Sequence, residues 1–283
     1  MKYRFLRFPE GKLKVVTFSY DDGCIHDIKL AEIFNKYGMK GTFNLNSSWI
    51  GTEKYMNLEQ IKTAILDAGH EIAIHGEQHR ANGKIRPIEG IRDVLNCRLF
   101  LEKEFGVFVR GMAYPHSGIN FFCNGTTFDR IVSYLQDLDI SYARSLNKVN
   151  GNLDLPTNWY EWNPTIGHNS ENIFTLIEKF MQIDPTKLTF QRRVPKIFFV
   201  WGHSYDFNNN NSWDRIEKIC EQLKGDDIWY ATNGEICDYI NAYHQLVYSA
   251  DGSMVYNPTV KTIWFETNNA SYKILPNETI NID

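Results

Sequence analysis

The chain has 283 residues, a length that suits one α/β barrel with a small appendage. Its 30 Lys and Arg residues and 34 Asp and Glu residues give a net charge of −4, and no basic run is longer than Arg192-Arg193, which excludes a generic nucleic-acid binder. Apolar residues make up 43% and charged residues 23% of the chain, and this composition excludes a disordered protein.

Short β-branched or aromatic runs alternate along the chain with segments whose apolar residues recur at intervals of three and four. Strands are predicted for residues 13–20, 40–45, 71–75, 107–114, 140–145 and 196–202. Helices are predicted for residues 28–37, 58–68, 88–105, 128–138, 172–181 and 213–223. Asn57 and Gly69 are typical capping residues at the two ends of the second helix. Alternating strands and helices indicate a parallel sheet, as in a (β/α) barrel.

The sequence changes character after residue 245. The turn pairs Asp251-Gly252, Asn257-Pro258, Asn268-Asn269 and Pro276-Asn277 separate short alternating segments, a pattern that predicts β-hairpins. We therefore predict a barrel over residues 1–245 and a small C-terminal β-hairpin appendage over residues 246–283.

The N-terminal residues and the cysteines indicate in which cellular compartment the protein is expected. Residues 1–8 alternate charged and aromatic side chains and lack the apolar core of a signal peptide. No later segment has the ~18 uninterrupted apolar residues that a membrane span needs. The five cysteines are scattered without a CxxC pair, which favours reduced thiols. We expect a cytoplasmic chain without a membrane span, whereas a signal peptide removed ahead of residue 1 would make the protein secreted.

Polar, reactive side chains follow four of the predicted strands. They lie in Ser19-Tyr20-Asp21-Asp22-Gly23, His75-Gly76-Glu77-Gln78-His79, Ala113-Tyr114-Pro115-His116 and Trp201-Gly202-His203-Ser204-Tyr205-Asp206. Because the carboxyl ends of barrel strands share one mouth, we expect these segments to meet there. Taken alone, a paired Asp before Gly is more typical of a turn than of a catalytic pair.

The second segment carries a metal-ligand spacing. His75 and His79 are four residues apart, so one helix face or one turn can bring both rings to the same cation. The pair is only suggestive, but a carboxylate from another strand end would complete a set of two imidazoles and one carboxylate. Three protein ligands leave room for water and substrate, as a catalytic metal requires.

These motifs resemble those of the polysaccharide deacetylase family, the NodB-like carbohydrate esterases of family 4, over most of residues 15–203. The family motif Thr-Phe-Asp-Asp-Gly is similar to the segment ending Tyr20-Asp21-Asp22-Gly23, and His-Ser/Thr-x-x-His is matched by His75 and His79, with Gly76 at the hydroxyl position. The family's strand ending Leu-x-His is matched by Val200-Trp201-Gly202-His203. The resemblance implies that Asp21 is the general base, that Asp22, His75 and His79 bind the metal, and that His203 is the general acid.

Two family motifs are altered in this chain. The third, Arg-Pro-Pro-Tyr, is replaced by Ala113-Tyr114-Pro115-His116, so the arginine that holds the base is missing from its position. Arg144, at the end of a predicted strand, is the candidate to replace it beside Asp21, and the alternative is a surface arginine that pairs with another acid. Arg110 is expected to face away from the mouth. The resemblance implies an oxyanion donor after Tyr114, and since Pro115 has no N–H, the backbone N–H of His116 is the candidate.

The fourth motif, Asp-x-x-Asp-Trp, is not found intact. Residues 155–162 supply aromatic rings without the matching spacing, and Trp162 is the ring expected to line a sugar cleft. Tyr114 is grouped with the same substrate-binding or supporting residues.

The resemblance implies a distorted (β/α) barrel and a metal-dependent hydrolase that removes acetyl groups from an N- or O-acetylated sugar or polysaccharide. The nitrogen-rich ligand set favours one Zn²⁺, and Co²⁺, Ni²⁺ or Fe²⁺ also fit it. One alternative is a related carbon–nitrogen hydrolase that acts on a small amide or cyclic ureide. The other is a non-catalytic carbohydrate-binding protein on the same scaffold, and the altered third and fourth motifs favour this alternative.

Overall fold

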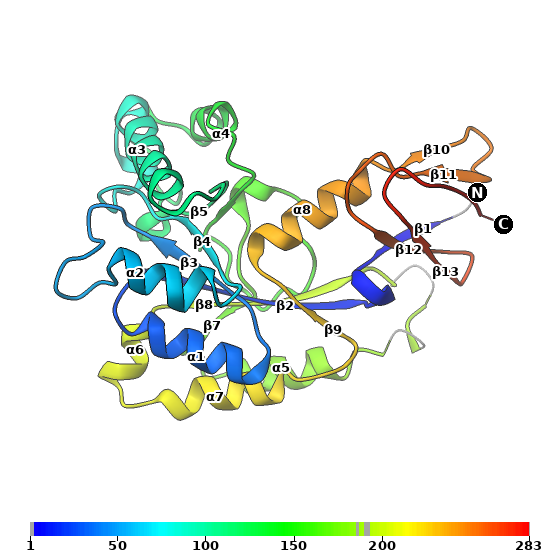
Figure 1. The fold of residues 1–283 in the computed structure, drawn as a ribbon, viewed down its shortest axis with the longest axis horizontal. Coiled ribbons are helices and arrows are strands. Elements are labelled where there is room, and N and C mark those ends of the chain that lie inside the picture. Colours follow the sequence, from blue (N-terminus) through cyan, green and yellow to red (C-terminus); the bar gives the residue numbers. More distant parts are fainter. Residues whose placement is uncertain (1–2, 185–186, 190–192, 283) are drawn as a thin grey trace.

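A parallel sheet forms the centre of the fold in a computed structural model that describes residues 3–184, 187–189 and 193–282. Its strands are β2 (Lys14–Asp22), β3 (Gly41–Leu45), β4 (Glu71–Ile74), β5 (Gly111–Ala113), β6 (Tyr142–Arg144), β7 (Ile166–Gly167), β8 (Lys196–Gly202) and β9 (Ile228–Tyr230). The spatial order is β6-β5-β4-β3-β2-β8-β7, with β9 also paired to β2, and every pairing is parallel. The sheet curls into an incomplete barrel (Figure 1), which confirms the predicted fold class.

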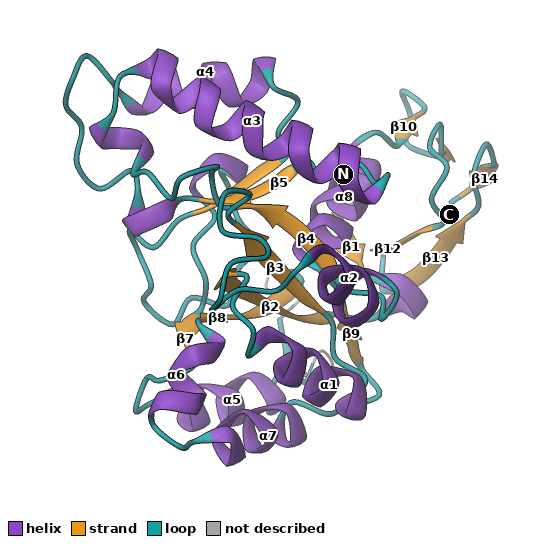
Figure 2. Ribbon diagram, turned by 60° about the vertical axis from the view of Figure 1, so that its left-hand side comes forward, coloured by secondary structure: helices purple, strands orange, loops and turns teal. Residues whose placement is uncertain are grey.

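Helices cover the outside of the curled sheet. They are α1 (Asp27–Tyr37), α2 (Leu58–Ile61), α3 (Pro87–Phe105), α4 (Phe128–Asp137), α5 (Ile173–Met181), α6 (Ser204–Asn209), α7 (Trp213–Gln222) and α8 (Asn233–His244). Figure 2 shows α3 and α4 on one side of the sheet and α1, α5 and α7 on the opposite side. The helix predicted over residues 58–68 divides into α2 and a π-helical turn, Lys62–Leu66, and Asn57 caps it as expected by accepting a hydrogen bond from the Gln60 N–H.

Strand β2 lies in the middle of the sheet and is buried over eight of its nine residues. Val16, Phe18 and Tyr20 pack into the core beneath the helices. Since successive strand residues point to opposite faces, Ser19 and Asp21 face the interior of the barrel. The strand therefore delivers Asp21 to the inner wall at its carboxyl end.

The C-terminal β-hairpins form a second unit beside the barrel. Its strands are β10 (Val247–Tyr248), β11 (Met254–Tyr256), β12 (Ile263–Thr267), β13 (Ala270–Ile274) and β14 (Thr279–Asn281). The N-terminal strand β1 (Arg4–Arg7) pairs antiparallel with β12, so both ends of the chain lie in this unit (Figure 1). One apolar cluster joins Phe265 of this unit to Val15 and Phe199 of the barrel, which shows that the unit shares the barrel's core.

No helix within the described ranges is long and apolar enough to cross a membrane.

Candidate metal and catalytic site

Three side chains predicted to bind a metal converge at the carboxyl ends of β2 and β4. Asp22 ends β2, His75 follows β4, and His79 lies one turn later. One potential ligand atom from each of the three lies within 4.8 Å of the others. The Asp22 Oδ1 atom is 3.6 Å from Nε2 of His75 and 3.5 Å from Nε2 of His79. This arrangement leaves space for a small cation among the three atoms.

The backbone of this cluster adopts conformations that most residues avoid. Asp22 has φ 81° and His79 has φ 55°, both in the left-handed region. Gly76 has φ 80°, and a Cβ atom there would lie 2.2 Å from Oδ2 of Asp93. A serine or threonine at residue 76 would therefore require the Asp93 side chain to shift and would hold a left-handed backbone conformation. Left-handed non-glycine residues are concentrated at functional sites.

The hydrogen bond of the His75 ring fixes its tautomer. Its Nδ1 atom lies 2.9 Å from the carbonyl oxygen of Ala113, and since a carbonyl only accepts, Nδ1 carries the proton. The lone pair is then on Nε2, the atom that faces Asp22. Burial lowers the pKa of His75, so the ring is neutral at pH 7. Burial, followed by the charges of His75 and His116, lowers the pKa of His79 to about 3.

A divalent cation fits this donor set. The Oδ1 atom of Asp22 is buried and receives no hydrogen bond from any described residue, which is costly for a carboxylate without a compensating charge. Burial is also the main reason that the pKa of Asp22 is raised. Two neutral imidazoles and one unpaired carboxylate oxygen are ordinary ligands for zinc and similar ions.

Asp21 lies beside this cluster but has other partners. Nη2 of Arg144 donates to its two carboxylate oxygens at 2.6 and 2.5 Å, and Nδ2 of Asn44 donates to Oδ1 at 2.9 Å. Arg144 is 1% exposed. Burial raises the pKa of Asp21, but the charges of Arg144 and the nearby histidines outweigh burial and lower it overall. Arg110 is exposed and donates to the Asp139 carbonyl, outside this site.

His203 completes the mouth from the end of β8. Its Nε2 atom is 3.9 Å from Oδ2 of Asp21 and 3.9 Å from Oδ2 of Asp22. Its Nδ1 atom faces Asp206, whose Oδ2 lies 3.9 Å away and also 3.3 Å from Nε2 of the buried His168. Sequence reasoning gave no role to Asp206, although its spacing of three residues from His203 at the start of α6 could have indicated the contact.

The remaining predicted site residues divide into two groups. His116 is exposed, has φ 53°, and places its ring centroid 4.3 Å from that of His79, so it lies at the mouth. Tyr114 is buried in the apolar core, and its hydroxyl donates to the Tyr160 carbonyl at 3.0 Å.

Trp162 is 2% exposed and packs its ring against Tyr142, Trp159 and Phe199 in the barrel core. Trp162 does not line the cavity beside the metal cluster. The segment that carries Trp162 crosses the open side of the barrel. The Trp162 backbone forms a β-bridge with Arg144, and its ring packs in the apolar core.

A cavity of about 580 Å³ opens directly beside the metal cluster. The residues that line it come from the end of β2, the loops after β2 and β3, and helix α6: Asp22, Cys24, Ile25, His26, Glu53, Lys54, Tyr55, Tyr205 and Asn209. Its volume is within the usual range for a small-ligand site, and its two tyrosines offer ring surface next to polar groups.

Comparison with known proteins connects this site to one family. Residues 9–139 match the family described as Polysaccharide deacetylase, and this segment contains Asp21, Asp22, His75 and His79. No curated protein in the search matches the chain.

Several solved structures have the same fold. One, assigned as a polysaccharide deacetylase of Mycobacterium smegmatis, is 15% identical, with a TM-score of 0.58 over 85% of this chain and 94% of that chain. The Xyl-CE4 domain of a multidomain xylanase from the hindgut metagenome of Trinervitermes trinervoides is 16% identical, with a TM-score of 0.52 over 82% of this chain and 92% of that chain.

A third structure with this fold is a mutant of a Bacillus anthracis CE4 family pseudoenzyme with restored enzymatic activity. It is 18% identical and has a TM-score of 0.51 over 83% of this chain and 70% of that chain. The match to a Streptococcus pyogenes deacetylase covers only 61% of that chain.

Residues 9–139 are thus similar to the polysaccharide deacetylase family, and the chain as a whole has the fold of these solved structures. The resemblance drawn from the strand-end motifs is thereby confirmed.

Proposed function

We propose that this chain is a metal-dependent hydrolase that removes acetyl groups from N- or O-acetylated carbohydrate. The main observation behind the proposal is that the adjacent carboxylates of Asp21 and Asp22 face different partners. Asp21 is held by Arg144, while Asp22 turns an unpaired oxygen toward the nitrogen atoms of His75 and His79. One carboxylate is thereby kept free of the cation and the other is offered to it.

Asp22, His75 and His79 would hold one divalent ion, and the nitrogen-rich set favours Zn²⁺ over Co²⁺, Ni²⁺ or Fe²⁺. Such an ion supplies positive charge that polarises an acetyl carbonyl and makes a neighbouring water more acidic. The His75 ring is already aimed by its bond to Ala113, so little reorganisation is needed for binding.

Asp21 is the proposed general base. Its low pKa keeps it ionised at neutral pH, and Arg144 and Asn44 fix the carboxylate at the inner wall of the barrel. In this position Asp21 accepts a proton from the attacking water.

His203 is the proposed general acid. Its Nε2 atom faces both aspartates across the mouth, which is the side on which the leaving group departs, and it returns the proton to the sugar nitrogen or oxygen. Asp206 faces the opposite nitrogen of the ring, with its Oδ2 atom 3.9 Å from Nδ1 of His203. A base and an acid on two sides of the proposed cation suit acetyl transfer to water.

Acetate release measured with and without metal tests the proposal. The substrates are an oligomer of N-acetylglucosamine and acetylated xylan, and the protein is first treated with a chelator and then reconstituted with one equivalent of Zn²⁺. Release is expected only after reconstitution, and the Asp22→Asn variant is expected to remain inactive. A protein that binds zinc stoichiometrically but releases no acetate would instead support the non-catalytic binding protein, and turnover of small amides alone would support the carbon–nitrogen hydrolase.

A further inference from the structure

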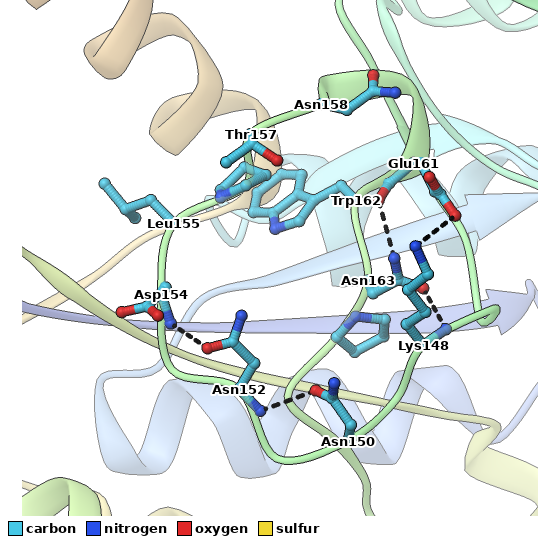
Figure 3. A pocket seen from close by; sticks show the side chains of 12 residues that line it. Lys148, Asn150, Asn152, Asp154, Leu155, Thr157, Asn158, Glu161, Trp162 and Asn163 are labelled. Carbon is cyan, nitrogen blue, oxygen red and sulfur yellow. Dashed lines mark hydrogen bonds and ion pairs between the residues drawn. The ribbon is translucent and has the colours of Figure 1, made fainter.

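A second pocket lies away from the metal cluster, in the segment that crosses the open side of the barrel (Figure 3). It measures about 300 Å³, at the lower end of the range for small-ligand sites. Its lining residues all belong to one stretch of chain: Lys148, Asn150, Asn152, Asp154, Leu155, Pro156, Thr157, Asn158, Glu161, Trp162, Asn163 and Pro164. None of the proposed catalytic residues contributes to it.

The Trp162 ring forms the inner wall of this pocket and presents an unused donor. The residue is 2% exposed, and its indole is held by aromatic contacts with Tyr142, Trp159 and Phe199. No described residue accepts a hydrogen bond from its Nε1–H, and in Figure 3 this nitrogen points into the pocket. A rigid, nearly buried N–H directed at an open space favours an acceptor atom of a ligand there.

Two asparagines add donors in fixed positions. The Asn150 side-chain oxygen accepts from the backbone N–H of Asn152, and the Asn152 oxygen accepts from the backbone N–H of Asp154. These bonds fix both amide groups and leave their NH₂ groups for other partners. In the view of Figure 3 the amide nitrogen of Asn152 points toward the side of the pocket on which the Trp162 ring lies, and both residues line this pocket.

The charges around the pocket disfavour an ionic ligand. Asp154 is paired with Lys196 at 2.5 Å, and Glu161 faces Lys148 at 4.0 Å. Each carboxylate therefore has its own cation, and the pocket has no excess positive charge to attract a phosphate or carboxylate. Leu155 and the two prolines add apolar surface to the indole, and the uncharged Thr157, Asn158 and Asn163 line the rest of the pocket.

We propose that this pocket binds a neutral sugar residue, separately from the metal cleft. A sugar combines hydroxyl oxygens, which accept from the indole and amide N–H groups, with apolar C–H faces, which pack against the proline and leucine side chains. The proposal does not depend on the hydrolase activity, because no residue of the metal cluster takes part.

Side-chain NMR of the tryptophans tests this site directly. The indole N–H signal of Trp162 is assigned as the one absent from Trp162→Phe, a substitution that keeps an aromatic ring in the core. Xylobiose and the disaccharide of β-1,4-linked N-acetylglucosamine are titrated, with inorganic phosphate as the charged comparison. At least one sugar is expected to shift the Trp162 signal with a dissociation constant of roughly 1 mM, whereas phosphate leaves it unchanged.

Asn152→Ala is expected to weaken this binding about fivefold, the usual effect of one lost hydrogen bond. Asn35→Ala, which removes an exposed asparagine on α1, is the matched control and leaves binding unchanged. Asp22→Asn also retains the binding, which separates this site from the metal cleft. The proposal is overturned if neither sugar shifts the signal, if phosphate shifts it as strongly, or if Asn152→Ala binds like the wild type.

Discussion

The buried pair of Asp21 and Arg144 allows a quantitative prediction. Arg144 donates to both carboxylate oxygens at 2.5 and 2.6 Å, and both side chains are almost inaccessible to water. Arg144→Met removes the guanidinium group and keeps an unbranched chain in its space. Asp21 then retains only the hydrogen bond from Asn44, so its negative charge lies in the barrel without a fixed cation. Breaking one side of a buried ion pair costs about 3–5 kcal/mol while the other side stays charged.

The variant can reduce this cost only by protonating Asp21, and the loss of stability must then depend on pH. In the wild type the pKa of Asp21 is lowered, so the pair stabilises the fold above the unfolded value near 3.8 and loses that contribution as the pH falls through the folded value. In Arg144→Met burial raises the pKa instead. The folded state then holds a proton that the unfolded state has released, and stability decreases as the pH rises above about 4.

Urea unfolding of chelator-treated protein at pH 5 and pH 8 measures this effect without metal. The difference in unfolding free energy between wild type and Arg144→Met is expected to grow from pH 5 toward pH 8, to about 3–5 kcal/mol at most. Arg110→Met is the matched control, because the Arg110 side chain is exposed and donates to the Asp139 carbonyl, away from Asp21. It is expected to change stability by less than ~0.5 kcal/mol at either pH.

The same variant is expected to lower kcat/KM for acetate release at pH 7, with metal content unchanged, and to move the acidic limb of the pH profile upward. A loss of stability that is equal at pH 5 and pH 8, or activity that falls in Arg110→Met rather than in Arg144→Met, would refute the assignment of Arg144 as the partner of the base.

Three further predictions concern metal binding, pH and packing. His75→Ala is expected to abolish stoichiometric zinc, and elemental analysis that finds undiminished metal in a folded variant would contradict the ligand set. Burial lowers the pKa of His70 from 6.5 to about 4. The unfolded chain therefore takes up a proton on His70 first as the pH falls, and the free energy of unfolding is expected to decrease by up to about 3 kcal/mol between pH 6.5 and pH 4. His70→Asn keeps an acceptor for the Gly41 N–H and is expected to flatten this part of the urea-unfolding profile, whereas an unchanged slope would assign it to other groups. Gly202→Ala would place a Cβ atom 2.0 Å from Nδ1 of His168 and is expected to cost about 1–3 kcal/mol in thermal unfolding, and an unchanged melting temperature would contradict this packing.

The strand ends were predictable because the relevant signals are local. Each long apolar run ends at a polar residue. Because the strands are parallel, their carboxyl ends, and with them these polar residues, lie at one mouth for any loop conformation. The structure accordingly places Asp22, His75 and His79 within reach of one cation. It also places Arg144, named from its position at a strand end, beside Asp21.

Other features depend on contacts that local sequence does not encode. Trp162 lies in an irregular segment, and only the incomplete closure of the barrel decides that its ring turns into the core. Strand β1 has too few residues to predict alone, and its pairing with β12 joins the two ends of the chain. The link from Asp206 to His168 requires β7 and β8 to be neighbours, a pairing for which periodicity gives no signal.

The central claim is that two adjacent aspartates have different roles, and Asp21→Asn tests it most directly when zinc content and acetate release are measured on the same sample. The side chain keeps its size and Asp22 is untouched, so one zinc per chain is expected to remain while acetate release falls at least ~100-fold, because the base is gone. Release near the wild-type rate, or loss of the zinc together with the activity, would contradict the separation of base and metal ligand.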